Sequence, residues 1–145
     1  MSPESALQSI AEEKQAQTGH LDLSFESLTE IPPQLAELTH LTSLNLDNNQ
    51  LTTLGGLDSL VNLTELSLRY NQLTTLGGLN TLVNLTKLYL DSNKLTTLGG
   101  LDSLVNLTEL DLRSNQLTAL EGLEGLVNLT SLYLRENELT TLGGL

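Results

Sequence analysis

Leucines recur along this chain with two different spacings, and both spacings return in every stretch of 22 residues. In the segment LTELSL, which begins at Leu63, leucines alternate with polar residues. A period of two predicts a short strand with one buried face. In LGGLNTLVNL, which begins at Leu76, leucines stand at every third position. That spacing favours a 3₁₀-like or irregular turn with one inward side. Each unit is therefore predicted to contain a strand, a bend and a loose helical return.

The units repeat along almost the whole chain, and full copies start at Leu41, Leu63, Leu85, Leu107 and Leu129. An earlier, degenerate unit is one residue longer, with PPQ in place of GG and Glu26 in place of a repeated Asn. Such a period indicates a solenoid, because no single unit has a second layer against which to bury its leucines. We expect residues 20–145 to form six units with parallel strands about 4.8 Å apart, the last unit incomplete or uncapped.

Two other frame positions call for a structural role. An Asn falls just past each strand, where backbone groups turn inward, and a stack of amides there can bond one coil to the next. The alternative is a row of amide ligands. The glycine pairs, such as Gly77 and Gly78, suit an unusual φ or close packing of coils, and no phosphate-loop motif is present. The predicted structural ladder consists of Asn49, Asn71, Asn93, Asn115 and Asn137.

The frame LTELSLRYNQLTTLGGLNTLVN strongly resembles the leucine-rich repeat in its 22-residue form, as in internalin-like proteins and the protein-phosphatase regulatory type. The first unit, LDLSFESLTEIPPQLAELTH, resembles the 23-residue bacterial class at the start of Roco-type arrays. The resemblance covers residues 20–145. It implies an α/β right-handed solenoid with a concave parallel β-sheet and irregular or 3₁₀ convex returns. Members of this family mostly bind other proteins on the concave sheet.

The two ends of the chain differ in pattern. Residues 1–19 are predicted to form an N-terminal capping helix, with Ser2 as the N-cap and Pro3 at the first position. The alternative is an amphipathic helix that binds a partner. The other end stops at LTTLGGL without a polar cap, so we expect continuation, excision or self-association through the uncapped edge. The stripe expected to cover the first unit consists of Ala6, Leu7, Ile10 and Ala11.

Composition narrows the function classes. The net charge of −12 predicts repulsion from nucleic acids and anionic membranes. The chain has no Cys, which excludes disulfides and Cys-based zinc sites. Neither a signal-peptide pattern nor a membrane-length apolar run is present, so a cytoplasmic location is expected. His20 and His40 lack the neighbours of a metal or nucleophilic site, so we expect no enzyme activity, cofactor or metal.

The residues that differ between units are predicted to point outward from the sheet. These positions hold all three tyrosines and four of the six basic residues of the chain. Tyr and Arg are enriched at interface hot spots. We predict a protein-binding surface here, and favour its C-terminal half as the anchor site. Its residues are Arg69, Tyr70, Lys87, Tyr89, Asp111, Arg113, Tyr133 and Arg135.

The same rows also allow a sheet that binds nothing. Along one row Asp47, Arg69, Asp91 and Arg113 alternate in sign, and opposite charges on adjacent strands stabilise each other by roughly 0.2–1 kcal/mol per pair. Three hypotheses follow from the sequence. The chain is a protein-binding module, a regulatory or scaffold arm of a larger multidomain protein such as a Roco-type GTPase with intramolecular contacts, or a spacer.

Overall fold

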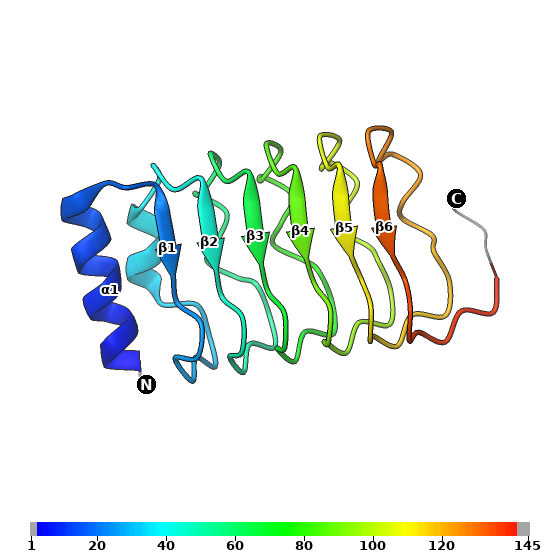
Figure 1. Cartoon of the computed structure of the whole chain (residues 1–145), viewed down its shortest axis with the longest axis horizontal. Helices are drawn as coiled ribbons and strands as arrows, with labels where there is room; N and C mark the ends of the chain where they lie inside the picture. Colours follow the sequence, from blue (N-terminus) through cyan, green and yellow to red (C-terminus); the bar gives the residue numbers. More distant parts are fainter. Residues whose placement is uncertain (1–2, 142–145) are drawn as a thin grey trace.

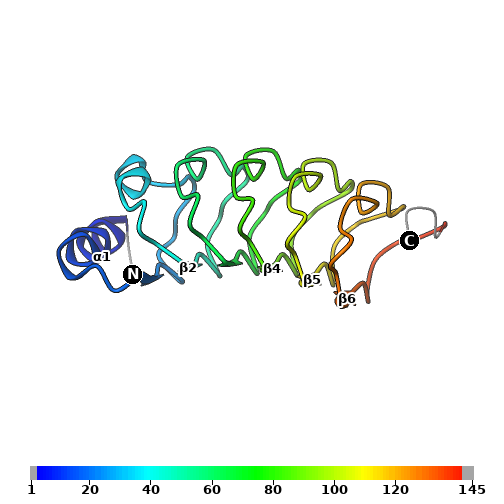
Figure 2. The same ribbon diagram turned by 90° about the horizontal axis from the view of Figure 1, so that it is seen from above.

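Six short strands lie side by side in one parallel sheet, and their spatial order follows their order in the chain (Figure 1). They occur in a computed structural model that describes residues 3–141. Seen from above, the array curves gently, with the strands on its inner side and the returns on its outer side (Figure 2). The predicted solenoid with a parallel sheet is confirmed. The strands are β1 (His20–Asp22), β2 (Ser43–Asn45), β3 (Glu65–Ser67), β4 (Lys87–Tyr89), β5 (Glu109–Asp111) and β6 (Ser131–Tyr133).

The register of the sheet places equivalent leucines beside one another. Leu66 of β3 pairs with Leu88 of β4, which in turn pairs with Leu110 of β5. All three side chains are fully buried. Burial is worth roughly 1.5–3 kcal/mol for each such leucine. Because each layer is completed only by the coils on either side of it, the stability of the core is shared between neighbouring units.

The returns on the outer side follow the three-residue spacing of their leucines. The first contains a 3₁₀ helix, η1 (Pro33–Glu37). A later return is held by hydrogen bonds three residues apart, from Leu82 N–H to the Leu79 carbonyl (3.0 Å) and from Leu85 N–H to the Leu82 carbonyl (3.1 Å). A 3₁₀-type turn has three residues per turn, so every third side chain faces the core. The prediction for the returns is confirmed.

Buried asparagines join consecutive coils at the bend after each strand. The Oδ1 of Asn93 accepts a hydrogen bond from Leu73 N–H (3.0 Å), and its Nδ2 donates to the carbonyls of Leu68 (2.9 Å) and Leu90 (3.0 Å). These bonds satisfy backbone groups that the bend turns inward. The same pattern of inter-coil bonds is made by Asn49, Asn71, Asn115 and Asn137.

Glu26 replaces the asparagine in the first unit, where a helix and not a coil precedes the first strand. An amide side chain donates to carbonyls of the preceding coil, as Asn49 does to the Leu23 carbonyl (3.0 Å). A carboxylate instead only accepts hydrogen bonds. The buried Glu26 accepts a hydrogen bond from the Ser5 hydroxyl (3.2 Å) in the first turns of the helix.

That helix, α1 (Pro3–Ala16), covers the first unit, as Figure 1 shows. Ala6 and Ile10 of the predicted stripe are buried in the core. Leu7 is instead 39% exposed, and Ala11 is also exposed, so the prediction was wrong for these two residues. The third buried position on this face is Glu13, which completes an i, i+4, i+7 spacing. Ser2, the predicted N-cap, lies outside the described residues.

Glu13 is a buried carboxylate that fastens α1 to the solenoid. It accepts hydrogen bonds from the Thr18 hydroxyl (2.5 Å) and Gly19 N–H (2.9 Å), and it pairs with His40 Nε2 (2.6 Å). Burial raises the pKa of Glu13, but the hydrogen bonds from Thr18, His40 and Gly19 together outweigh it, so the pKa lies below its ordinary value. The ionised form is therefore the one that the folded state stabilises.

The substitution Glu13→Gln is expected to lower the free energy of unfolding by about 1–3 kcal/mol at neutral pH, because a charged acceptor of three bonds is lost. A depressed carboxylate pKa stabilises the fold above the unfolded pKa, and that stabilisation disappears as the pH falls through the folded pKa. The gap between the native chain and the variant should therefore narrow below about pH 4.5. Urea titrations from pH 7 to pH 3 measure this difference in stability, and the variant Glu12→Gln, at an exposed position of the same helix, serves as the control. A gap that widens on acidification contradicts the assignment.

At the other end of the array the leucine layer is partly open among the described residues. Leu129, Leu132 and Leu134 are only partly buried, whereas their counterparts in the preceding unit are fully buried. No described helix has the length and apolar character needed to cross a membrane.

Candidate binding face

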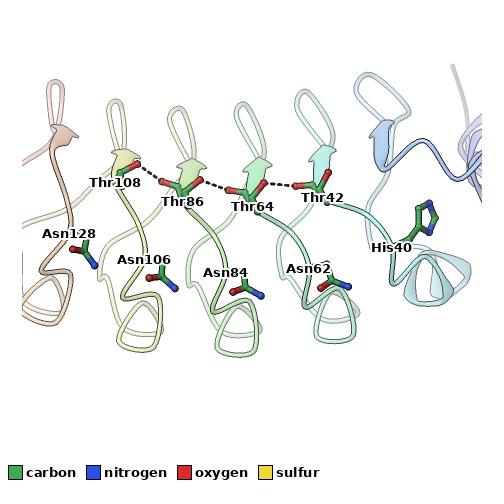
Figure 3. A pocket seen from close by; sticks show the side chains of 9 residues that line it. All are labelled: His40, Thr42, Asn62, Thr64, Asn84, Thr86, Asn106, Thr108 and Asn128. Carbon is green, nitrogen blue, oxygen red and sulfur yellow. Dashed lines mark hydrogen bonds between the residues drawn. The ribbon is translucent and has the colours of Figure 1, made fainter.

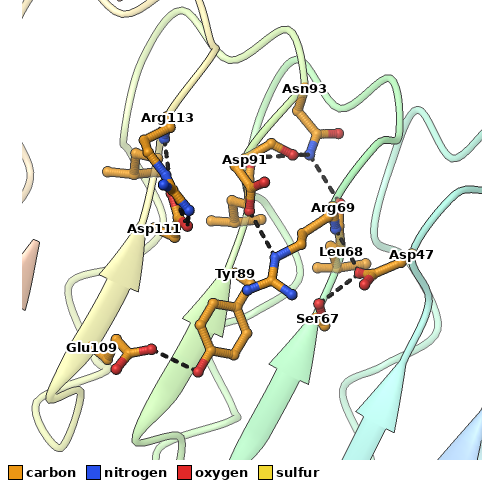
Figure 4. Close-up of polar contacts among 12 residues, drawn as sticks. Asp47, Ser67, Leu68, Arg69, Tyr89, Asp91, Asn93, Glu109, Asp111 and Arg113 are labelled. Carbon is orange, nitrogen blue, oxygen red and sulfur yellow. Dashed lines mark hydrogen bonds and ion pairs between the residues drawn. The ribbon is translucent and has the colours of Figure 1, made fainter. Parts of the chain in front are cut away.

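The candidate binding surface is the inner side of the sheet. It is formed by the side chains on either side of the central leucine of each strand, together with the residue two positions beyond the strand. Alternation along a strand sends these side chains to the face opposite the leucines. We call this surface the concave face. Its central part contains several of the predicted contact residues (Figure 4).

Two arginine–tyrosine stacks organise the concave face. The guanidinium carbon of Arg69 lies 4.2 Å from the centroid of the Tyr89 ring on the next strand. Two units further on, the guanidinium carbon of Arg113 lies 5.2 Å from the ring centroid of Tyr133. Such contacts are worth about 0.5–1 kcal/mol at exposed sites. The structure therefore brings four of the predicted residues together in two equivalent pairs.

Tyr89 is held by contacts with both neighbouring strands. Arg69 covers its ring, and its hydroxyl donates a 2.7 Å hydrogen bond to Glu109 Oε2 on β5 (Figure 4). Burial and the bond to the Glu109 carboxylate raise the pKa of the phenol, so it remains protonated and keeps donating. Glu109 was not among the predicted contact residues. The sequence signal that would have identified it is its position on the outward face of the strand next to Tyr89.

A contact residue must lie on the accessible surface, but Asp111 is buried. The residue is 1% exposed, and Arg113 binds both of its carboxylate oxygens, at 2.6 Å through Nη2 and 3.0 Å through Nε. Bidentate pairing of this kind is strong and fixes geometry. Residues two apart on an extended chain share a face, which makes the pairing local. Asp111 thus orients Arg113, and its burial leaves no surface for a partner.

The alternating charge row forms only in part. Arg69 Nε pairs with Asp91 on the next strand at 3.0 Å. Asp47 uses its carboxylate differently, accepting bonds from the Ser67 hydroxyl (2.6 Å) and from Arg69 N–H (2.8 Å). Arg113 turns to Asp111 on its own strand, away from Asp91. The sequence rows identified the neighbours correctly, but the choice between a lateral partner and a local one was not predictable from them.

Burial and the nearby charge of Asp111 raise the pKa of Asp91, although Arg69 opposes the shift. Two carboxylates and two arginines therefore share the centre of the face. Each carboxylate there is bound by one guanidinium, which holds both side chains in defined positions.

The remaining predicted residues are accessible. Lys87 and Arg135 are exposed, and within the described part of the chain neither forms an ion pair. Tyr133 is 42% exposed and Tyr70 is 57% exposed. Tyr70 also has a φ of +57°, in the left-handed region that bulky residues seldom adopt. The same conformation recurs at this position in the other units, with φ from +56° to +62° at Asn48, Ser92, Ser114 and Glu136, so it belongs to the repeated bend.

A second surface runs along the edge of the solenoid, where a polar trough of about 760 Å³ is lined by one Asn and one Thr per unit (Figure 3). Its side chains bond to the preceding coil, as Asn84 Nδ2 does to the Val61 carbonyl (2.9 Å) and the Thr86 hydroxyl to the Thr64 carbonyl (3.1 Å). These bonds are structural. His40 holds the Asn position in the first unit, and its bond to Glu13 explains the exchange.

Comparison with known proteins identifies the repeat. Family models described as leucine-rich repeats match residues 18–73, 61–103 and 105–145. The chain belongs to the leucine-rich repeat family. This fold is commonly a protein–protein interaction module, typically without enzymatic activity. Within the described residues, no group of three or more His, Cys, Asp or Glu is placed to hold a metal ion.

Solved structures extend the comparison. An internalin, InlF, from Listeria monocytogenes is 33% identical with a TM-score of 0.76, over 85% of this chain and 36% of that one. A leucine-rich repeat protein from Leptospira interrogans is 35% identical with a TM-score of 0.78, over 99% and 43%. TLR13, solved in complex with ssRNA13, is 29% identical with a TM-score of 0.73, over 81% and 18%. A search of curated protein sequences found no significant match.

These relatives set limits on the finer predictions. The chain spans less than half the length of each of the three structures above. None of the three is a phosphatase-regulatory or Roco-type protein, so those resemblances stay predictions. Because one relative was solved with RNA, the fold by itself does not exclude nucleic acid as a partner. For this chain that exclusion rests only on its charge.

Proposed function

We propose that the chain is a protein-binding module that contacts its partner on the concave face. The observation that carries the proposal is that some side chains of this face are fixed by contacts with each other while others remain accessible to a partner. Arg69, Tyr89 and Arg113 are held in place by stacking and ion pairs, while Tyr133 and Arg135 stay accessible beside them. A preorganised surface loses little side-chain freedom on association. Exposed Tyr and Arg on such a surface are the residue types that dominate binding energy at interfaces.

The eight predicted contact residues therefore divide into two groups. Lys87, Tyr133 and Arg135 are the proposed contact groups, and Tyr70 flanks them in the turn after β3. Arg69, Tyr89, Asp111 and Arg113 form the rigid frame between them. The accessible groups are one aromatic ring and two cations, so the proposal favours a partner that presents both an apolar patch and carboxylates to the half of the face nearer β6.

The test compares the native chain with two variants as paired baits for proteins from the source cells. The concave variant is Lys87→Ala/Tyr133→Ala/Arg135→Ala, and the convex control is Val61→Ala/Val83→Ala/Val105→Ala, which alters three exposed valines of the returns. Truncating a hot-spot anchor costs about 2 kcal/mol or more, so the concave variant should lose its partner by at least about 30-fold. Equal retention by both variants contradicts the proposal. Circular dichroism verifies that both variants are folded.

A second candidate function is an arm of a larger protein. The observation in its favour is that the solved relatives are longer, since the chain spans 36% of InlF and 43% of the Leptospira protein. In such an arm the concave face would bind another part of the same polypeptide. A Roco-type GTPase is the form expected from the first unit alone. The parent reading frame discriminates between this candidate and an independent module.

A further inference from the structure

The concave face is hollowed between β2 and β3. This hollow has a volume of about 210 Å³, and its walls include Ser43, Asn45, Asp47, Glu65, Arg69 and Tyr89. It lies toward the N-terminal half of the sheet, away from Tyr133 and Arg135, while the third proposed contact group, Lys87, is in register with Glu65 of its wall. The sequence rows did not predict it, because they do not fix the side-chain positions of its walls, such as Arg69, which pairs with Asp91 and stacks on the Tyr89 ring.

We propose that this hollow binds a cationic side chain, lysine or arginine, carried by the protein partner. The inference rests on the concave-face function proposed above and names the chemistry of one of its contacts. A lysine ammonium or an arginine guanidinium donates several hydrogen bonds and accepts none. It therefore needs a site that is rich in free acceptors, has a net negative charge and offers a wall for the alkyl stem. The hollow has all three properties.

Free acceptors are present on two sides of the hollow. Among the described contacts, the Glu65 carboxylate accepts no hydrogen bond. Asp47 accepts from the Ser67 hydroxyl (2.6 Å) and Arg69 N–H (2.8 Å), both through Oδ1, which leaves Oδ2 available. Asp47 and Glu65 are both only partly buried, so these oxygens are accessible to a donor that a ligand brings.

The charge around the hollow is negative. Asp47 and Glu65 line it, and Asp22 stands beside it in register with Asn45. Arg69 is the one cation in the wall, and its Nε is already paired with Asp91 at 3.0 Å. Lys87 lies in register with Glu65 but forms no ion pair with it in the described structure. The three acids, Asp22, Asp47 and Glu65, therefore outnumber the two neighbouring cations, Arg69 and Lys87, and charge complementarity favours a positive occupant.

Tyr89 supplies the wall for the alkyl stem. Its ring lines the hollow, and the stacked Arg69 and the bond to Glu109 fix its position. Long cationic side chains bury their methylene stems against apolar surface while the charged group reaches polar partners. A cation that enters here lies between an aromatic ring and two carboxylates. Together with the exposed Arg135 near β6, the hollow gives the concave face a polarity, so the partner's basic part is placed over β2 and β3.

The test is a titration of the ¹⁵N-labelled chain with N-acetyl-lysine methylamide and N-acetyl-arginine methylamide, at constant ionic strength. The neutral control is N-acetyl-norleucine methylamide. The expected result is a saturable shift of the amide signals of Glu65, Ser67 and Arg69 with one or both cationic probes and no saturation with the neutral one. Equal responses to the charged and neutral probes overturn the inference.

A matched pair of variants distinguishes binding at the hollow from non-specific attraction of a cation to an acidic protein. Glu65→Gln removes one charge from the hollow, and Asp102→Asn removes one from an exposed outer return. We expect Glu65→Gln to weaken the cationic probe about three- to five-fold, and Asp102→Asn to change its affinity less than about 1.5-fold. Equal weakening by the two variants overturns a local site.

The failure of this inference is distinguishable from failure of the proposed function. If the concave variant loses a captured partner while the cationic probes show no site, the hollow inference fails and the function stands. If the probes bind the hollow while the concave and convex variants retain the same proteins, the proposed function fails and the cation site remains.

Discussion

Replacing Asn93 with alanine is expected to lower the free energy of unfolding by about 2–3 kcal/mol. The side chain links two consecutive coils. The Leu68 carbonyl also accepts from Asn71, and the Leu90 carbonyl from Asn115, so each carbonyl keeps one partner in the variant. Leu73 N–H, whose acceptor is Asn93 Oδ1, is left buried without a partner. An orphaned buried donor costs about 1–3 kcal/mol, and the cavity left by the amide adds to it.

Asn84→Ala is the matched control, since it removes the same atoms from the exposed row at the solenoid edge. Asn84 donates one 2.9 Å bond to the Val61 carbonyl and can be replaced there by water. Its loss should cost less than about 1 kcal/mol. Urea unfolding followed by circular dichroism measures both variants. Similar losses of unfolding free energy at the two positions would mean that the buried asparagines contribute no more to stability than the exposed asparagines at the edge.

Most of the fold was predictable because one short frame recurs. A period of two around Leu66 can only bury one face of a strand, and a period of three around Leu82 suits only a 3₁₀-type return. No single repeat unit can bury its leucines alone, so the units must stack, and stacking makes their strands a parallel sheet. The position of each asparagine just past a strand also pointed to inward-turned backbone groups, and those are the groups that Asn93 bonds.

The pairing of charged side chains was not predictable in the same way. A row of residues fixes which strands are neighbours, but an arginine reaches both the next strand and the residue two positions back on its own strand. Arg69 takes the lateral partner Asp91, whereas Arg113 takes the local partner Asp111 and buries it. The difference depends on what each neighbouring carboxylate already binds, and this is a property of the assembled face.

The buried face of α1 shows another limit of pattern reasoning. Apolar spacing selected Leu7 and Ala11, yet both are exposed, and Glu13 takes the inward position. Burial of a carboxylate is favourable only where hydrogen-bond donors surround it in the folded structure. For Glu13 those donors come from the turn after the helix and from His40 in the first return. Local sequence periodicity contains no information about partners that arrive from other elements.

The two glycines of each pair differ in their surroundings, although the sequence presents them as equivalent. A Cβ on Gly77 would meet no atom within 4 Å. A Cβ on Gly78 would lie 2.9 Å from the Leu54 carbonyl oxygen of the preceding coil, and Gly78 has a φ of +109°. The fifth unit supports the distinction. Glu121 occupies the first position of its pair, while Gly122 keeps the second with the same φ of +109°.

The substitution Gly78→Ala is therefore expected to lower the free energy of unfolding by about 2–4 kcal/mol, because it adds backbone strain and pushes two coils apart. Gly77→Ala should change it by no more than about 0.5 kcal/mol, or raise it slightly by restricting the unfolded chain. Thermal and urea unfolding of the two variants decide the matter. Comparable destabilisation at both positions would show that flexibility of the whole GG segment, and not the close approach of consecutive coils, accounts for the glycines of this solenoid.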